Sequence, residues 1–447
     1  MIPPPASPSG PRPLTALIAR SALRRFLVLT VLRWLPVGLL IPVLIVLGLD
    51  RGLTLSQLGL AAAVQGFVVF GLELPTGGLA DSIGRRRVLL VAMAISIAST
   101  AVLLVAHSFA AFVVAFALQG IYRALDSGPL EAWYVDAALA ADPEAPIDRG
   151  MAGQGTAAGL SIATGALTGG GLVALDPLAA VDALLVPVGL SLVVQVVALI
   201  VAAFAMRETP PSTGLRGLSR SVLSTPRTIA DGIGLLRRSR VLLALVAVEL
   251  FWGFGMVCFE ALLPARLVEI AGGTDRAAAI TGPAASGAWL ASAAGAMIMP
   301  WLGRRLGIAP AAALMRLAQG LAVAGMGLFA GVAGLLVAYL ACYAVHGASN
   351  AAHMTLLHRQ VEGPVRATVV SLNSMVAQPA GAFGIIALTA IADAASISTA
   401  LYVGAVVLAV AAPLYLPAWR QARRPPIPDP DPSPVPIGPS AAADDGP

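Results

Sequence analysis

Charged residues are scarce in this chain of 447 residues, and lysine is absent. Only 11% of the residues are charged, and all 28 basic residues are arginine. With a mean hydropathy of +0.86, the composition lies far from that of a soluble domain and indicates an integral membrane protein. Without lysine the chain has no GxxxxGK[ST] phosphate-binding loop, which excludes an ATPase site of its own. Arginine keeps its proton, so its expected role is fixed positive charge.

Cysteine and histidine are also rare. The two cysteines, Cys258 and Cys342, lie in apolar segments, where we expect core thiols and no structural disulfide. The four histidines do not form a metal-binding pattern such as HExxH, so we expect no metal site and no cofactor. The first 25 residues lack the short apolar core and cleavage site of a signal peptide, so the first apolar segment should stay in the mature protein.

Long apolar runs dominate the rest of the chain. Each is long enough to cross a bilayer as a helix, which bonds every backbone group within its own segment. None shows the alternation of a membrane β-barrel. The sequence therefore predicts an all-α polytopic membrane protein with twelve transmembrane helices. We expect these helices near residues 26–49, 56–76, 86–106, 109–133, 153–175, 183–206, 241–263, 280–302, 309–330, 334–356, 368–391 and 397–418.

Arginine placement predicts the topology. If the N-terminus is inside, 22 of the 28 arginines fall on the cytoplasmic side and three on the other. Both termini should therefore be cytoplasmic, in the cell membrane (plasma or inner). The net charge of +5 is then an orientation signal, and we expect no nucleic-acid partner. The expected domains are a cytoplasmic N-terminal tail (1–25), an N-terminal six-helix bundle (26–206), a basic cytoplasmic linker (207–240), a C-terminal six-helix bundle (241–418) and a proline-rich disordered cytoplasmic tail (419–447).

The segment 77–90, GGLADSIGRRRVLL, joins the second and third apolar runs. Its pattern G-x-L-A-D-x-x-G-R-R resembles the signature loop of the major facilitator superfamily, with Ser82 in place of the usual basic residue. A shift of 219 residues places the Gly-Arg-Arg of 84–86 on that of 303–305, which we expect to lie in the loop after the second span of the second half. The resemblance implies two pseudo-symmetric six-helix bundles and secondary transport by alternating access, with the substrate near the midplane between them.

The same resemblance implies roles for the loop residues. In the family, the matching aspartate and arginine form a cytoplasmic latch that holds the two bundles together in the outward-facing state. The alternative is a positively charged anchor at the headgroups without a gating role, which we favour for Arg87. The implied latch residues are Gly77, Asp81, Gly84, Arg85 and Arg86, with Glu131 or Asp136 as the acidic partner.

Ionisable residues inside the apolar runs are functional candidates, because charge in hydrocarbon is costly. In one interpretation they neutralise each other, Arg33 with Glu73 or Asp126, and Glu249 with Arg316. In the other, an acid is left partly unpaired toward a cavity and carries the coupling proton. Arg123 shares a helix face with Asp126, which argues against Asp126 as the proton carrier. The candidates are Arg33, Glu73, Arg123, Asp126, Glu249 and Arg316.

His346, Asn350 and His353 form a polar stripe on one predicted helix, because they are spaced i, i+4, i+7. The stripe fits either a proton relay or packing hydrogen bonds to Asn373 or Gln378. Polar and aromatic side chains on several spans are candidate contacts for an amphipathic substrate. They are Trp34, Gln65, Gln119, Tyr122, Trp252, Asn373 and Gln378.

The run 159–175, GLSIATGALTGGGLVAL, is rich in small residues. Its Gly165, Gly169 and Gly170 resemble the G-P-x-x-G-G antiporter signature of the drug-exporting branch, with Ala166 in place of proline. The alternative is close packing against the similarly small run of the eighth span, GPAASGAWLASAAGAM. Such packing is compatible with the sliding interface of a transporter that rocks.

We therefore expect a membrane transporter and not an enzyme. The predicted function is proton-coupled export of small amphipathic molecules by a monomer in the lipid bilayer, with protons as the coupling ion. The alternative is proton-coupled uptake of a small nutrient or metabolite. Two remote alternatives are a receptor that does not transport and an intramembrane hydrolase, for which Ser349 lies near His346 and His353.

Overall fold

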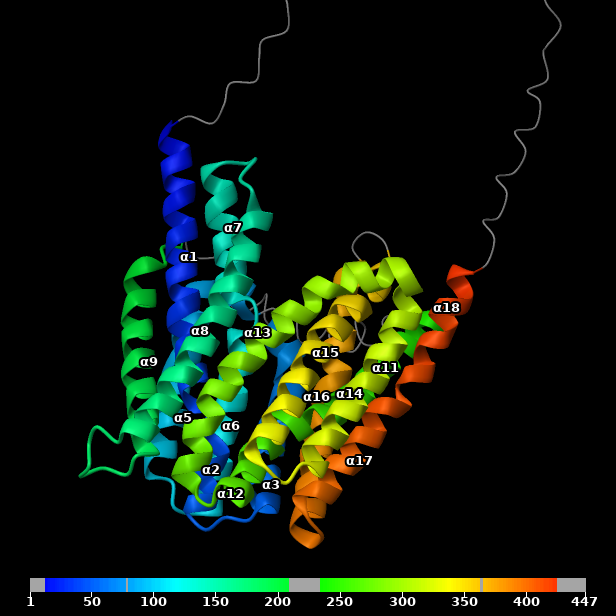
Figure 1. The fold of residues 1–447 in the computed structure, drawn as a ribbon. Coiled ribbons are helices and arrows are strands. Elements are labelled where there is room, and N and C mark those ends of the chain that lie inside the picture. Colours follow the sequence, from blue (N-terminus) through cyan, green and yellow to red (C-terminus); the bar gives the residue numbers. More distant parts are fainter. Residues whose placement is uncertain (1–12, 78, 209–233, 362–364, 424–447) are drawn as a thin grey trace, which may run out of the picture.

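The computed structural model describes residues 13–77, 79–208, 234–361 and 365–423, and these residues form helices and short connections without strands (Figure 1). The N-terminal half contains α1 (Pro13–Leu40), α2 (Leu44–Asp50), α3 (Leu55–Gly77), α4 (Leu79–Ile83), α5 (Arg85–Val105), α6 (Phe109–Asp126), α7 (Pro129–Ala141), α8 (Ile147–Leu175) and α9 (Leu185–Ala205). The C-terminal half contains α11 (Arg240–Glu260), α12 (Leu262–Ala271), α13 (Thr274–Leu306), α14 (Ile308–Leu328), α15 (Val332–His358), α16 (Val365–Ala394), α17 (Ile397–Val410), the 3₁₀-helix η1 (Ala412–Tyr415) and α18 (Leu416–Ala422).

In the part of the chain that the structure describes, each half contains six crossings, and several crossings consist of two helices with a short break. Among the described residues, eleven segments are long and apolar enough to span a membrane. The twelfth crossing is α13, whose 33 residues are long enough. Its glycine, serine and proline residues lower its hydropathy below that of the other crossings. The prediction of an all-helical membrane protein with two six-helix bundles is confirmed.

Two helices extend beyond the predicted bundles. α1 begins at Pro13, inside the expected N-terminal tail, because a proline at the first helical position is followed by helix-forming leucine, alanine and arginine. α18 continues to Ala422, past the expected end at 418. The remaining parts of the predicted tails and linker, residues 1–12, 209–233 and 424–447, lie outside the described residues.

The loop signature and its echo in the second half differ in structure. Gly84, with φ 102°, separates α4 from α5, so the chain turns at the predicted point. Residues 303–305 instead continue α13, and the turn comes at Gly307, with φ 85°. The prediction of a loop at 303–305 is wrong, because the positive φ of the tight reversal is adopted by Gly307.

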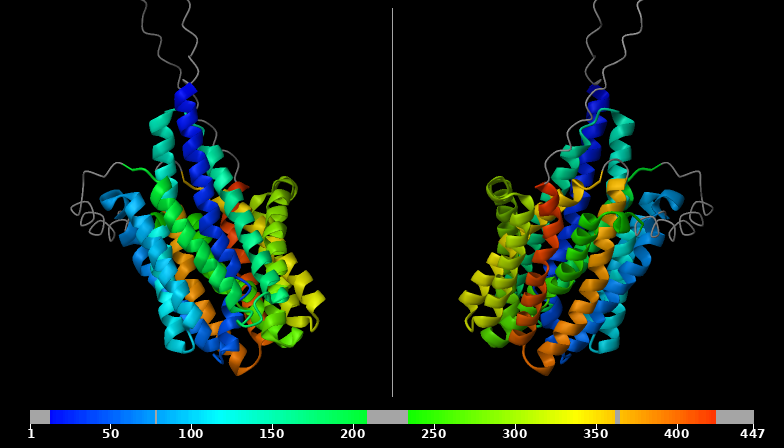
Figure 2. Two further views of the ribbon diagram at one scale, coloured as in Figure 1. Left: turned by 90° about the vertical axis from the view of Figure 1, so that its left-hand side faces the viewer. Right: turned by 90° about the vertical axis from the view of Figure 1, so that its right-hand side faces the viewer.

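The hydrophobic core shows how the halves meet. Both described chain ends lie at one end of the molecule, which we call the terminal end (Figure 2). At the opposite end, one continuous buried cluster includes residues of both halves, such as Leu58 and Phe112 with Phe259 and Leu388. At the terminal end, each half has a separate cluster. The halves are therefore joined at the opposite end, which we call the closed end, and diverge toward the terminal end (Figure 1).

Helices of the two halves cross closely toward the closed end. A Cβ atom on Gly170 of α8 would lie 2.8 Å from the Cα atom of Gly282 of α13, so this crossing requires glycine. Asp393 of α16 accepts a hydrogen bond from the N–H of Ser56 at the start of α3 (2.7 Å). A carboxylate of one half thus caps a helix of the other half.

The glycines of 159–175 pack in two directions. Gly170 faces the eighth span, as the packing alternative predicts. A Cβ atom on Gly165 would instead lie 2.9 Å from Gly38 of α1, and one on Gly169 would lie 2.7 Å from the carbonyl of Leu39. α8 therefore uses its small residues both to hold α1 in its own half and to meet α13 of the other half.

Candidate functional site

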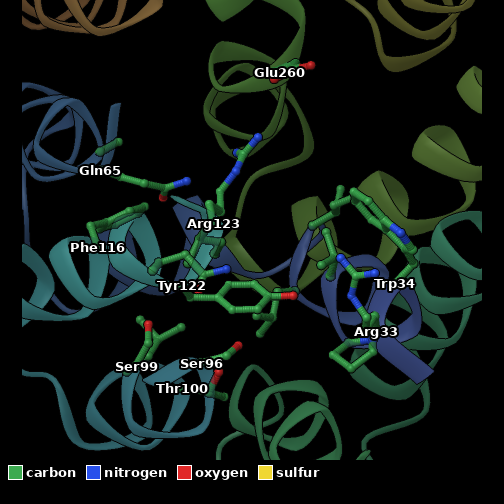
Figure 3. A pocket seen from close by; sticks show the side chains of 18 of the residues that line it. Arg33, Trp34, Gln65, Ser96, Ser99, Thr100, Phe116, Tyr122, Arg123 and Glu260 are labelled. Atoms are coloured by element: carbon green, nitrogen blue, oxygen red, sulfur yellow. The ribbon is translucent and has the colours of Figure 1, made fainter. Parts of the chain in front are cut away.

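A cavity of about 680 Å³ lies between the two halves. Most of its wall is apolar or aromatic, with contributions mainly from α1, α5 and α6 of the N-terminal half and from α11, α12, α13 and α15 of the C-terminal half. Figure 3 shows part of this lining. Such a wall with a few convergent polar groups is typical of sites for small organic molecules. The polar and charged side chains are Arg33, Gln65, Ser96, Ser99, Thr100, Gln119, Arg123, Asp126, Ser127, Glu131, Gln195, Glu260 and Thr281.

The crossing formed by α6 and α7 is broken beside the cavity. α6 ends at Asp126, Gly128 has a φ of 95°, and α7 begins at Pro129. Glycine permits this left-handed conformation, and proline starts a helix where its missing N–H is not needed. The last carbonyls of α6 lack helical partners, and Arg33 Nη2 lies 3.4 Å from the Asp126 carbonyl. The span predicted at 109–133 is thus two helices rather than one.

Arg33 of α1 is enclosed by acidic groups of the same half. It forms an ion pair with the Asp126 carboxylate, and its Nη1 lies 3.7 Å from Glu131 Oε1. Glu131 in turn accepts a hydrogen bond from Gln154 of α8. The Arg33 side chain is 5% exposed, so protein groups and not bulk water offset its charge. Of the two partners predicted for Arg33, Asp126 is the one in contact.

Arg123 and Glu260 face the same cavity from different halves. Arg123 extends from α6 toward the helix that carries Glu260, the last residue of α11 (Figure 3). Both side chains are exposed to the cavity. Neither makes a hydrogen bond or an ion pair with any residue that the structure describes, although the two charges lie within electrostatic range of each other. The space between them is therefore open to water or a ligand.

Glu260 was missed in the sequence, where it appeared as an acid near the end of an apolar run. The chain breaks between Glu260 and Leu262, and this break places the side chain beside the cavity. The internal repeat of the sequence could have indicated this helix break. The shift of 219 residues places position 260 on Ile41, which lies in the break between α1 and α2 next to Pro42. Corresponding crossings of the two halves are thus broken at corresponding points.

The signature loop is held within the N-terminal half at the terminal end. The Arg85 guanidinium forms an ion pair with Asp136 of α7. The backbone N–H groups of Arg85 and Arg86 donate to the two carboxylate oxygens of Glu208, each at 2.9 Å. An acid at a helix N-terminus satisfies N–H groups that have no helical partner. Of the two acids predicted for the latch, Asp136 contacts Arg85, and Glu208 is a contact that the sequence did not reveal.

Two further latch residues are placed only by their backbone. Gly77 ends α3, and Asp81 lies in α4. The side chain of Asp81 is outside the part of the chain that the structure describes, so its role in the latch stays a prediction.

A second polar cluster lies in the C-terminal half, away from the cavity lining. His353 Nε2 lies 3.2 Å from Glu249 Oε1 and 3.1 Å from Asn373 Oδ1, and its Nδ1 lies 3.1 Å from the Tyr415 hydroxyl. Arg316 acts on Glu249 only at longer range, and the described residues contain no ion pair between them. The contacts of His353 are those that the packing interpretation expects.

The predicted polar stripe on α15 is divided among different surroundings. His346 lies beside Trp252, with 3.3 Å between Nδ1 and Nε1, whereas Asn350 is exposed and His353 is buried. None of the three lines the cavity. Ser349 Oγ is buried and has no hydrogen-bond partner among the described residues. The serine of the hydrolase alternative therefore has no base in contact.

The predicted substrate contacts fall into two groups. Those that line the cavity are Trp34, Gln65, Gln119 and Tyr122. The others lie outside its lining: Trp252, Asn373 and Gln378. Glu73 is also outside the lining, within electrostatic range of Arg123.

Comparison with known proteins identifies relatives of this fold. No curated protein matches the sequence. Among solved structures, the nucleoside transporter NupG matches with a TM-score of 0.71 at 11% identity, over 89% of this chain and 99% of that chain. A bacterial homologue of the human lysosomal transporter Spinster, in an inward-facing and unoccupied conformation, has a TM-score of 0.71 at 15% identity, over 94% and 100%. The peptide transporter POT in complex with sulfate has 0.68 at 17%, over 91% and 98%.

These identities relate the proteins by fold alone. The sequence itself gives a stronger result, because a family model described as Major Facilitator Superfamily matches residues 26–384. This match contains the signature loop, most of both halves and every charged residue of the cavity. The protein therefore belongs to the Major Facilitator Superfamily and is a membrane transporter.

Proposed function

We propose that this transporter exports small amphipathic molecules through the central cavity in exchange for protons. The observation that carries the proposal is a cavity with apolar and aromatic walls from both halves and one carboxylate, Glu260, that makes no hydrogen bond or ion pair with a described residue. Asp126 is already paired with Arg33, and arginine does not release its proton. We therefore assign the coupling proton to Glu260.

We place the terminal end in the cytoplasm of a cell whose plasma or inner membrane holds the protein, because arginine is concentrated there. With this orientation the halves diverge toward the cytoplasm, and the conformation is inward-facing. A cavity that opens to the cytoplasm suits collection of cargo from inside. The similar structures include a transporter of nucleosides and a transporter of peptides, which supports a small organic cargo.

The proposal includes a gate at the terminal end. In the outward-facing state, this end of the two halves must close while the closed end opens. Here Arg85 pairs with Asp136 of its own half, and Glu208 holds the start of α5. We assign the loop around Asp81 and Arg85 to the contact that forms with the C-terminal half when the terminal end closes.

Flux in proteoliposomes tests the coupling. Purified protein is reconstituted with a panel of fluorescent amphipathic compounds, and transport is followed with and without an imposed pH gradient. We expect the gradient to drive accumulation, and Glu260→Gln to abolish this drive while downhill exchange of substrate continues. Glu269→Gln is the matched control, because Glu269 is a glutamate on α12 that pairs with Arg266 outside the cavity.

A wild-type transport rate that does not depend on the pH gradient would disprove proton coupling. If Glu260→Gln kept the gradient-driven accumulation, the proton would belong to another residue. Direction is measured in cells that express the protein: lower accumulation of the same compounds supports export, and higher accumulation supports the uptake alternative.

A further inference from the structure

We infer that Arg123 and Glu260 together form a binding site for a dipolar substrate, a small molecule with an anionic group and a cationic group on an apolar body. The inference rests on the proposed function, since it names the substrate class of the same cavity. It adds a requirement for both charges on one molecule, which an amphipathic cargo in general does not need.

The first support is the placement of the two charges. Arg123 belongs to the N-terminal half and Glu260 to the C-terminal half, and Figure 3 shows the arginine directed across the cavity toward the helix of the glutamate. Both side chains are exposed, and neither makes a hydrogen bond or an ion pair with a described residue. A molecule between them meets a cationic fork on one side and a carboxylate on the other, so its orientation is determined.

The second support is that the other charges lining the cavity are already matched. Arg33 is held by Asp126 and Glu131, and Glu131 is also bonded to Gln154. A ligand that approached this cluster would have to displace a protein group. Arg123 and Glu260 are thus the charges that remain for a ligand.

The third support is the energetic selectivity of such a pair. A charged group that is removed from water without a partner is strongly unfavourable. A ligand with one charge would desolvate both Arg123 and Glu260 but compensate only one, and a neutral ligand would compensate neither. A dipolar ligand compensates both, and the guanidinium fork matches a carboxylate with two parallel hydrogen bonds.

The apolar wall indicates the body of the ligand. Aromatic rings from both halves line the cavity near the two charges, including Phe116 and Tyr122 on one side and Phe259 and Tyr343 on the other. Aromatic rings pack well on one another and also attract cations. We therefore assign an aromatic or bulky apolar group to the centre of the substrate.

A set of four related compounds tests the inference: L-tryptophan, tryptophanamide, N-acetyltryptophan and N-acetyltryptophanamide, with glycyl-tryptophan as a longer dipolar probe. L-tryptophan carries both charges, tryptophanamide only the cation, N-acetyltryptophan only the anion and N-acetyltryptophanamide neither charge. Glycyl-tryptophan carries both charges at a wider separation. Binding to the purified full-length protein is measured as thermal stabilisation at pH 7, without membrane or gradient. We expect a dipolar probe to bind at least tenfold more tightly than every singly charged or neutral compound.

Two variants assign each charge. In Arg123→Gln we expect the dipolar compound and its amide to bind equally, and in Glu260→Gln the dipolar compound and its N-acetyl form. Arg266→Gln, outside the cavity, should leave the order of affinities unchanged. Three results overturn the inference: the neutral compound binds as tightly as the dipolar compound, no compound stabilises the protein, or both variants weaken the binding of all compounds equally. Because no gradient is involved, these results are independent of proton coupling.

Discussion

At the scale of single residues, the cavity contains one charge pair that is buried and one that is open. The Arg33 and Asp126 side chains are 5% and 13% exposed and contact each other, so each keeps the other from being an isolated charge in the bundle. Arg123 and Glu260 have no such contact. The same residue types therefore serve structure at one point of the cavity and face the ligand space at another.

Removal of one partner from the buried pair should be more harmful than removal of both. Arg33→Gln leaves the Asp126 carboxylate without its counter-charge, and we expect a loss of about 3–5 kcal/mol in unfolding free energy. Arg33→Gln combined with Asp126→Asn should recover a large part of that loss. Thermal and denaturant unfolding of the purified protein measure both.

Arg266→Gln is the control for this cycle, because Arg266 pairs with an exposed glutamate and surface pairs contribute about 0–1 kcal/mol. If the double variant is no more stable than Arg33→Gln alone, the main role of the Arg33 and Asp126 pair is not to neutralise each other's charge.

Residue-scale prediction from the sequence was partly successful for pairs of buried charges, since Arg33 contacts Asp126 but Glu249 contacts His353 and not Arg316, and it was poor where backbone breaks decide the contacts. The pairing of Arg33 with Asp126 was one of two alternatives, because both lie in apolar runs and need a partner. Glu260 was missed because its depth depends on the break after it, and Glu208 because a helix-capping role depends on two segments that are distant in sequence.

At the scale of helices, the breaks beside the cavity share a logic. A helix that ends inside the membrane leaves carbonyls and N–H groups without partners, which is tolerated only where a cavity or protein groups supply them. The break after Asp126 is served by Arg33, and that after Glu260 opens to the cavity. Turn glycines and helix-starting prolines are visible in sequence, but hydropathy hides such breaks because the flanking residues remain apolar.

Gly128 should be the residue that keeps the fourth crossing broken. Its φ of 95° is a conformation that other residues rarely adopt, so Gly128→Ala should cost about 1–2 kcal/mol of unfolding free energy. Gly155→Ala on α8 is the matched control, because that glycine is helical and a Cβ atom there meets nothing within 4 Å. It should stabilise by about 0.5–1 kcal/mol.

Thermal unfolding of the two variants gives opposite signs if the backbone argument holds. Equal small shifts in the same direction would show that the break does not require the left-handed conformation of Gly128. Gly128→Ala should also weaken substrate binding, since Gly128 and Asp126 both line the cavity.

At the scale of the whole molecule, sequence reasoning predicted the number of crossings and the two halves because these depend on hydropathy and on the repeat. It did not predict the conformation, which depends on contacts between α3 and α16 and between α8 and α13. Packing of small residues on the eighth span was foreseen, but which glycine would contact it was not, because three glycines lie within six positions.

Adjacent glycines of α8 offer a direct test of the closed end. A Cβ atom on Gly170 would meet the backbone of Gly282, whereas one on Gly171 meets nothing within 4 Å. Gly170→Ala should therefore push the halves apart at the closed end and slow transport several-fold, and Gly171→Ala should do neither. Spin labels on cysteines introduced at the exposed positions Leu178 and Arg276 report the separation.

Both native cysteines are fully buried, so the labels go to the introduced sites. If Gly171→Ala widened the distance as much as Gly170→Ala, the crossing would not be what joins the halves.

The shared apolar cluster at the closed end has a consequence for the transport cycle. Both halves contribute to one core there, while at the terminal end each half keeps its own. Separation of the closed end must expose part of that core, whereas its re-formation buries it again. The two strokes of the cycle are therefore unequal at this end: re-formation of the shared core is favourable, and its opening must be offset by burial at the terminal end or by a bound ligand.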